Sequence, residues 1–401
     1  METASTTKAY RDCESGGREP DHQHPTHQHH APQAPPLGPA RFSSLCGSVC
    51  AVDQPLPHAA DSPDARPVIR LGFAGFWDSF NPRDNFLTRL LETRWRVELV
   101  AEPDYLIHSC IGRGRHDHRR FDCVRIFYTG ENVAPDWLST DWAFSFEYTD
   151  HPRHFRLPHW PFYIDPPRLV KGLPAGGPAP AAPPDVEAIL AARPRFCGFV
   201  VSNPLCQTRN EFFRRLSKYK RVDSGGKLFN NLGGRVADKR AFLAECRFTI
   251  AFENESHPGY TSEKVAEPML VSTIPIYWGD PLVGNDFDTQ SFLSFHDTPP
   301  GPGLSATAAL DLLVDRVVAA DRDPAIYAGM LARPWYRGNR VPRCAAAAAI
   351  LAQFERIFTT PIDSVSRRRG PARLLGLDRT PDVLRSIGLR LKRKWRQWTA
   401  R

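Results

Sequence analysis

IAFENESHPGYTSEKVAEPMLVSTIPIYWG, residues 250–279, combines an apolar run, a polar loop, a helix start and a second apolar run. Phe248–Phe252 is an apolar run short enough for a buried strand. Glu253, Asn254 and Glu255 follow it, where the carboxyl edge of a parallel sheet would lie, and ligands bind at such edges. The stretch therefore predicts an α/β fold with a ligand site at this edge of the sheet.

The polar loop leads into a predicted helix. Gly259, Thr261 and Ser262 supply a turn and a cap before Glu263 and Lys264. Backbone N–H groups at the helix start and the lysine can then face a phosphate together. The spacing alone also fits an ordinary strand, loop and helix with solvated charges. The pattern thus indicates an anion site, with an ordinary surface turn as the alternative.

The same stretch resembles the signature of the α1,3-fucosyltransferases, glycosyltransferase family 10. In that family the matching asparagine, tyrosine, glutamate and lysine bind GDP-fucose, which places the donor contacts at Asn254, Tyr260, Glu263 and Lys264. The resemblance implies that Lys264 neutralises the diphosphate and that Glu263 holds the ribose. A transferase that uses another nucleotide sugar stays open, because the same charges would serve it nearly as well.

A second segment, Phe196–Gly226, resembles the strand, turn and helix that precede the donor site in the family, and the family's arginine falls on Arg209. A planar guanidinium donates two parallel hydrogen bonds to phosphoryl oxygens, so Arg209 and Lys264 can stabilise a departing diphosphate without a metal. The alternative for Arg209 is a charge on a solvated helix face, because several basic residues follow it closely.

The catalytic base is sought in Val124–Asn132, VRIFYTGEN, a strand that resembles the family's other recognisable motif. The resemblance implies a carboxylate that takes the proton of the acceptor hydroxyl as it attacks the anomeric carbon opposite the diphosphate, which inverts the configuration. Glu131 is the predicted base. Glu147, at the end of the predicted strand Trp142–Glu147, is the competing candidate, and a third interpretation makes Glu131 a structural cap.

Two Asp-x-Asp triplets, Asp286-Phe287-Asp288 and Asp321-Arg322-Asp323, match the pattern by which many sugar-nucleotide transferases hold Mg²⁺ or Mn²⁺. The first lies in a predicted polar loop and the second in a predicted turn at a helix end. Because Arg209 and Lys264 already offer two cations, we predict catalysis without a required metal. Nine cysteines without a C-x-x-C pair predict reduced thiols with no chemical role.

Strand and helix patterns alternate along most of the chain, at 68–163 and 196–293, with helices near Thr307–Ala320 and Cys344–Phe358. The resemblance implies the GT-B architecture, in which two Rossmann-like domains face a cleft. The predicted segments are a disordered His/Pro-rich tail at 1–66, an N-terminal acceptor-binding Rossmann-like domain at 67–165, a Pro/Ala/Gly-rich linker at 166–192, a C-terminal GDP-fucose-binding Rossmann-like domain at 193–360, and a basic amphipathic tail at 361–401.

The basic charge of the chain is concentrated at its end. Residues 367–401 hold twelve Lys or Arg against two Asp, whereas the whole chain has a net charge of +8. Apolar residues recur there at spacings of three and four: Leu384, Ile387, Leu391, Trp395 and Trp398. We predict an amphipathic helix that binds an anionic membrane surface through residues 381–401. A nucleic-acid contact or packing on the chain's own domain is the alternative.

Other classes are disfavoured. The chain shows no zinc spacing and no aromatic strand typical of RNA-binding domains, so we predict no nucleic-acid partner. The first residues are polar and charged, and no apolar run approaches the roughly 20 residues of a spanning helix. We expect a cytoplasmic protein, peripheral on the inner face of the membrane. The histidines of the first 30 residues could bind a metal, but a solvated tail is favoured.

The predicted function is an inverting α1,3-fucosyltransferase that moves L-fucose from GDP-fucose to the 3-hydroxyl of N-acetylglucosamine in a β-galactosyl acceptor, which gives a Lewis-type product. The resemblance covers roughly residues 120–295, and nothing recognisable precedes Arg125. The loop Glu255–Pro258 departs from the motif, so α1,4 linkage stays open, as does an acceptor on lipopolysaccharide, glycolipid or free oligosaccharide. A non-catalytic membrane-associated protein that binds a glycan or nucleotide is the alternative from another class.

Overall fold

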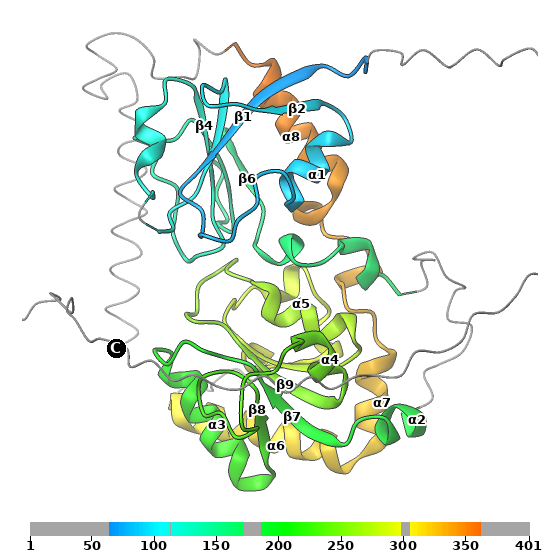
Figure 1. The fold of residues 1–401 in the computed structure, drawn as a ribbon. Helices are drawn as coiled ribbons and strands as arrows, with labels where there is room; N and C mark the ends of the chain where they lie inside the picture. Colours follow the sequence, from blue (N-terminus) through cyan, green and yellow to red (C-terminus); the bar gives the residue numbers. More distant parts are fainter. Residues whose placement is uncertain (1–63, 113, 172–185, 298–304, 362–401) are drawn as a thin grey trace, which may run out of the picture. The chain divides into compact units, whose positions relative to one another are not determined.

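The computed structural model describes residues 64–112, 114–171, 186–297 and 305–361. The predicted disordered tail and the predicted amphipathic helix lie almost wholly outside these ranges, as does the Pro/Gly-rich stretch 172–185. The described chain forms one six-stranded and one five-stranded sheet, and every pair of neighbouring strands in them is parallel (Figure 1). The predicted α/β class with two parallel sheets is confirmed.

The first sheet has the strand order β2-β1-β3-β4-β5-β6. The segment 96–108 forms two strands, β2 and β3, which pair with opposite sides of β1, and the loop that contains Pro103 connects them. Gly72 makes room for this loop, since a Cβ there would lie 2.9 Å from Cγ of Pro103. The elements are β1 Val68–Ala74, α1 Phe86–Glu92, β2 Arg96–Leu99, β3 Tyr105–His108, β4 Val124–Tyr128, β5 Trp142–Ser145 and β6 His154–Arg156.

Helix α8 (Ala347–Thr359) belongs to the core of the first sheet. Its buried residues Ile350, Phe354 and Ile357 follow helical spacing and pack in the same cluster as the apolar side chains of β1 to β5. Figure 1 shows α8 beside α1 at this sheet. The predicted C-terminal domain, 193–360, includes this helix, but its apolar face packs in the core of the first sheet. The spacing of apolar residues shows that a helix is amphipathic, but it does not show which sheet the helix covers.

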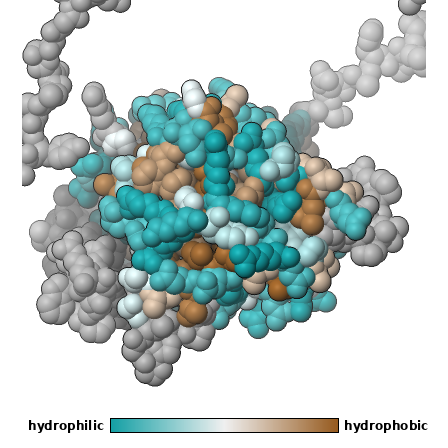
Figure 2. Space-filling view, turned by 90° about the horizontal axis from the view of Figure 1, so that it is seen from below, coloured by the Kyte–Doolittle hydropathy of each residue, from teal (hydrophilic) through white to brown (hydrophobic). Residues whose placement is uncertain are grey.

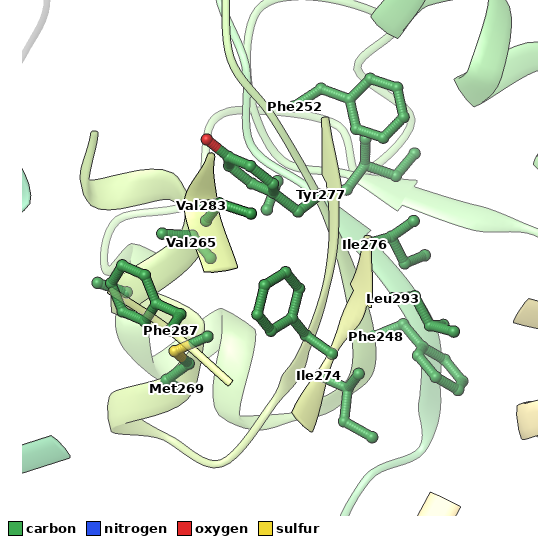
Figure 3. Packing of buried hydrophobic residues seen from close by; sticks show 14 of the residues in the cluster. Phe248, Phe252, Val265, Met269, Ile274, Ile276, Tyr277, Val283, Phe287 and Leu293 are labelled. Carbon is green, nitrogen blue, oxygen red and sulfur yellow. The ribbon is translucent and has the colours of Figure 1, made fainter. Parts of the chain in front are cut away.

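The second sheet has the strand order β11-β10-β9-β7-β8. Val265 and Met269 of helix α5 pack beside Val283 and Phe287 in its core (Figure 3). Leu169, in the predicted linker, is also buried in this core. The elements are η3 Pro166–Leu169, α2 Val186–Ala191, β7 Arg195–Phe199, α3 Gln207–Tyr219, β8 Val222–Ser224, α4 Lys239–Ala244, β9 Cys246–Phe252, α5 Glu263–Leu270, β10 Ile274–Trp278, β11 Leu293–Ser294, α6 Ala306–Arg322 and α7 Pro324–Ala332.

The described residues on one face of the molecule are mostly polar (Figure 2). Hydrophilic residues cover most of the face in Figure 2, and apolar ones are scattered over it. Leu205, in the loop between β7 and α3, is 79% exposed and is the most exposed large apolar side chain among the described residues. Within the same residues, no helix is long and apolar enough to cross a bilayer.

Candidate functional site

The carboxyl edge of the second sheet places two polar loops side by side. Phe252 of β9 pairs with Trp278 of β10, so the strands end together, and the N–H of Glu253 donates to the carbonyl of Trp278 at 2.8 Å. Gly279 leaves the space that the side chain of Glu253 fills, since a Cβ at Gly279 would lie 2.4 Å from Cγ of Glu253. The carboxylate of Glu253 is thereby directed into a buried position at this edge.

Glu253 is fully buried and forms the centre of a polar network at the start of α5. Its Oε1 accepts the N–H of Ser262 at 2.7 Å, and the hydroxyl of Ser262 lies 2.7 Å from Oε2. Ser262 also caps the helix, because its Oγ accepts the N–H of Lys264 at 3.4 Å. A buried carboxylate is stable there because it meets free N–H groups and the positive end of the helix dipole.

Lys264 completes the network. Its Nζ lies 3.0 Å from Oε2 of Glu253, 2.9 Å from Oγ of Ser262 and 3.7 Å from Oε1 of Glu263. Burial alone would lower the pKa of Lys264, but the charges of Glu253 and Glu263 raise it above its ordinary value. An ammonium has three N–H donors, and Glu253 and Ser262 use two of them. The third can serve an oxygen of an anionic ligand.

Glu263 is the first residue of α5, and its side chain is about one-fifth exposed. Burial would raise its pKa, but the positive charges of Lys264 and Lys239 outweigh burial and lower the pKa to about 2. The carboxylate is therefore ionised at neutral pH and can only accept hydrogen bonds. Such a group suits ligand hydroxyls.

Arg209 is fully buried, so the interpretation of it as a solvated charge on a helix face is wrong. Its Nη1 donates to Oδ1 of Asn254 at 2.9 Å and to the carbonyl of Phe252 at 3.2 Å, and its Nη2 donates to the carbonyl of Asn203 at 2.7 Å. Its Nε has no hydrogen-bond partner among the described residues. Arg209 thus fixes Asn254 and the loop after β7 at the edge of the sheet.

Tyr260 lies in the loop between Glu253 and α5 and is almost fully buried. Burial, and then the charge of Glu253, raise the pKa of its phenol. Its ring packs against the ring of Phe146 in a T-shaped arrangement, with 5.4 Å between the ring centroids. Asp280 holds the loop from the other side, because its carboxylate accepts the N–H of Gly259 at 2.7 Å and the hydroxyl of Thr261 at 2.9 Å. Gly259 needs its φ of +85°, and a Cβ there would lie 2.2 Å from the carbonyl oxygen of Phe146.

The two candidate bases differ in exposure. Glu131 is exposed in the loop after β4, and its carboxylate has no hydrogen-bond or ion-pair partner among the described residues, which argues against the interpretation as a cap. Asn132, the next residue, donates a hydrogen bond to the carboxylate of Glu255 in the loop 253–262 between β9 and α5, which we call the donor loop, so the segment that carries Glu131 lies beside it. Glu147 has a side chain that is only 12% exposed and lies 3.8 Å from Nε2 of His257. Exposure favours Glu131.

Both Asp-x-Asp triplets have structural roles. Asp286 forms two hydrogen bonds with Arg156, at 3.0 and 2.8 Å, and the fully buried side chain of Asp321 pairs with Lys220 and, at 3.4 Å, with Arg247. The second acid of each triplet caps a short helix. Within the described ranges, no group of three or more His, Cys, Asp or Glu side chains could hold a metal ion.

Of the six residues predicted for the site, the structure brings Arg209 together with Asn254, and Glu263 together with Lys264, at one edge of the second sheet. Tyr260 lies in the loop between these pairs, and the charge of Lys264 acts on its phenol. Glu253 and Asp280 were not predicted as site residues. The signal for Glu253 was present, since a carboxylate directly after a buried strand and before a serine-capped helix can pair with that helix start.

Two family models match successive parts of the chain. The N-terminal domain of α-(1,3)-fucosyltransferase FucT matches residues 71–163, and the C-terminal part of glycosyltransferase family 10 (fucosyltransferase) matches residues 190–300. Between them they match about half of the 401 residues. The first match begins well before Arg125, where the sequence alone showed no resemblance, because that half lacks a short motif that stands out by itself.

Known proteins with similar sequences include α-(1,3)-fucosyltransferases. The α-(1,3)-fucosyltransferase FucT of Helicobacter pylori is 29% identical over 263 residues, which cover 58% of this chain and 54% of the relative. The α-(1,3)-fucosyltransferase 4 of Bos taurus is 28% identical over 182 residues, 42% of each chain. The chain therefore spans about half the length, or less, of these relatives.

Solved structures share the fold. A crystal structure of an α1,3-fucosyltransferase superposes with a TM-score of 0.62 at 25% identity and covers 74% of this chain and 91% of that protein. A crystal structure of an α1,3-fucosyltransferase with GDP-fucose superposes with a TM-score of 0.58 at 24% identity and covers 76% and 94%. The two parallel sheets therefore have the arrangement of elements found in these enzymes.

Proposed function

Because this chain belongs to glycosyltransferase family 10, the fucosyltransferases, we propose that it transfers L-fucose from GDP-fucose to the 3-hydroxyl of N-acetylglucosamine in an N-acetyllactosamine-type glycan. The observation that carries the proposal is the meeting of the family's donor-binding residue types at one sheet edge. Asn254 is held by Arg209 at 2.9 Å, and Glu263 and Lys264 open the adjacent helix, with 3.7 Å between their charged atoms.

Each donor-site residue has a distinct task in this proposal. Lys264 gives its third N–H to a diphosphate oxygen, and the ionised Glu263 accepts from the ribose hydroxyls. Because Oδ1 of Asn254 accepts from Arg209, the amide NH₂ is left to donate to the donor sugar nucleotide. The positive charge of Arg209 next to Asn254 adds to the electrostatic stabilisation of the departing GDP.

Glu131 acts as the general base. Its exposed carboxylate takes the proton of the acceptor hydroxyl as the oxygen attacks the anomeric carbon of fucose, and GDP leaves from the opposite face. The configuration at that carbon inverts as a result. No metal is required in this proposal, because the acids of both Asp-x-Asp triplets serve ion pairs and helix caps.

The proposal also includes where the protein acts and what carries its acceptor glycan. The protein is cytoplasmic and binds the anionic inner face of the membrane through residues 381–401, supported by the basic and tryptophan-containing pattern of that segment. That surface suits an acceptor carried on a lipid or a lipopolysaccharide precursor. An α1,4 linkage is the alternative product.

The decisive experiment measures GDP release from GDP-fucose by the purified protein, with and without N-acetyllactosamine, in EDTA. Acceptor-dependent release in EDTA supports a metal-independent transferase, and the NMR spectrum of the product then distinguishes α1,3 from α1,4 linkage. GDP binding without release for any glycan acceptor tested would favour a protein that binds nucleotide and does not catalyse. Tighter binding of UDP than of GDP would reassign the donor.

A further inference from the structure

His159 lies between the proposed base and the proposed donor loop. It immediately precedes the 3-10 helix η2 (Trp160–Phe162), and its imidazole covers the α-carbon of Gly130. A Cβ at Gly130 would lie 2.4 to 2.5 Å from three ring atoms of His159. Since Gly130 directly precedes Glu131, the position of the ring limits where the backbone that carries the base can lie.

Two tyrosine hydroxyls fix the imidazole. Nδ1 of His159 lies 2.6 Å from the hydroxyl of the fully buried Tyr128, and Nε2 lies 3.3 Å from the hydroxyl of the exposed Tyr163. If Nδ1 carried the proton, the hydroxyl hydrogen of Tyr128 would be buried without an acceptor, which is costly. Tyr128 therefore donates to Nδ1, Nε2–H donates to Tyr163, and the hydroxyl hydrogen of Tyr163 faces water.

The backbone of the same residue contacts the donor loop. The N–H of His159 donates at 3.2 Å to the carbonyl of Thr261, two residues before Glu263. Burial lowers the pKa of His159 to about 4, against the opposing charge of Glu263, so the imidazole is neutral at neutral pH. A neutral ring keeps the acceptor at Nδ1 that the hydroxyl of Tyr128 needs.

We propose that His159 is a positioning residue for the transfer reaction, which holds Glu131 through Gly130 while its backbone ties the donor loop at Thr261. This inference rests on the proposed function, because it assigns the base to Glu131 and the donor to the loop before α5. Leucine at this position would leave the hydroxyl of Tyr128 without its acceptor. It would also replace the planar ring that packs on Gly130 with a branched chain of different shape, so the backbone that carries Glu131 would shift.

The test compares His159→Leu, His159→Asn and the double variant His159→Leu with Tyr128→Phe for kcat, for GDP affinity by calorimetry and for thermal stability. We expect His159→Leu to lower kcat about 100-fold, because a displacement of about 1 Å has that effect on a reacting group. GDP affinity should stay within about twofold, because the backbone N–H to Thr261 is kept. Asparagine keeps an oxygen near the position of Nδ1, so His159→Asn should recover most of the loss. Tyr128→Phe added to His159→Leu should lower kcat no further.

His154 provides the matched control. It is a half-buried histidine on β6 whose Nε2 lies 2.9 Å from the hydroxyl of Ser145, and desolvation lowers its pKa to about 3. His154→Asn should change thermal stability and leave kcat within about threefold. The inference is overturned if His159→Leu keeps its kcat, if GDP affinity falls as far as kcat, or if His154→Asn loses kcat equally. A wild-type protein without acceptor-dependent GDP release would overturn the proposed function as well.

Discussion

Glu253 and Lys264 form an ion pair at the first turn of α5, with 3.0 Å between Oε2 and Nζ and with the Glu253 side chain wholly buried. The lysine that faces the proposed diphosphate is therefore oriented before any ligand arrives. Preorganisation of this kind lets a charged group act on a ligand without a further cost of ordering its long side chain. The buried carboxylate holds the helix start and the lysine in one network.

Replacing Glu253 by Gln should destabilise the protein by about 2 to 4 kcal/mol, because the positive charge of Lys264 loses its buried partner. The measurement is the free energy of unfolding in urea. Glu255→Gln is the matched control on the same loop: Glu255 is exposed and should change stability by less than about 0.5 kcal/mol. Equal midpoints for the two variants would mean that the Glu253 pair does not support the loop.

Glu131→Gln should lower kcat about 100-fold or more and leave GDP affinity intact, because only proton removal from the acceptor depends on its carboxylate. Glu147→Gln should stay within about tenfold of the wild type, since Glu147 lies against His257 and is mostly buried. Steady-state kinetics with saturating GDP-fucose and calorimetry with GDP separate the two effects. The reverse order of the two losses would reassign the base to Glu147.

The sequence was most informative where a short pattern determines local structure. The apolar run before Glu253 and the serine cap before Glu263 predicted β9, the polar edge and the start of α5. The helices predicted near 307–320 and 344–358 are α6 and α8 with slightly different ends. These elements could be predicted because hydrophobic periodicity and helix capping involve only residues that are close together in the chain.

Contacts between distant segments were not predictable in the same way. His159 meets Gly130 and Tyr128, which lie about thirty positions earlier, and no periodicity links them. The charge run after Arg209 suggested a solvated helix face, but α3 buries Arg209 because the carbonyls at the end of β9 accept its N–H groups. Which cations are buried depends on acceptors that only the folded chain brings near.

The structural roles of the Asp-x-Asp acids predict which substitutions destabilise the protein and whether its activity persists without a divalent metal. Asp286→Asn should destabilise the protein by about 3 to 5 kcal/mol, because Arg156 would lose its bidentate anion in a mostly buried site. Asp288→Asn should be nearly neutral, since asparagine caps a helix start as well as aspartate does. Activity of the wild type and of Asp288→Asn should persist in EDTA. Loss of activity in EDTA, restored by Mn²⁺, would contradict the structural role of these acids.

A last prediction concerns acid stability and begins with two stacked histidines. The rings of His108 and His118 lie 4.0 Å apart with an angle of 13° between them, and neither nitrogen of His118 has a hydrogen-bond partner among the described residues. Burial, and then the positive charge of Arg125, lower the pKa of His118 to about 4, and burial lowers that of His108 well below its ordinary value.

The unfolded chain binds protons on these rings below pH 6.5, whereas folded His118 does so only near pH 4, so the free energy of unfolding should fall as the pH drops from 6.5 to 4. His118→Phe keeps an aromatic ring against His108 and removes two unsatisfied nitrogens. It should raise stability by about 1 kcal/mol at pH 7 and make the fall with acid shallower. His116→Gln removes a histidine at an exposed neighbouring position and should change the slope less than His118→Phe does. Urea unfolding measured at several pH values between 4 and 7 tests this prediction. If the free energy of unfolding of His118→Phe depends on pH as steeply as that of the wild type, groups other than His118 govern the acid response.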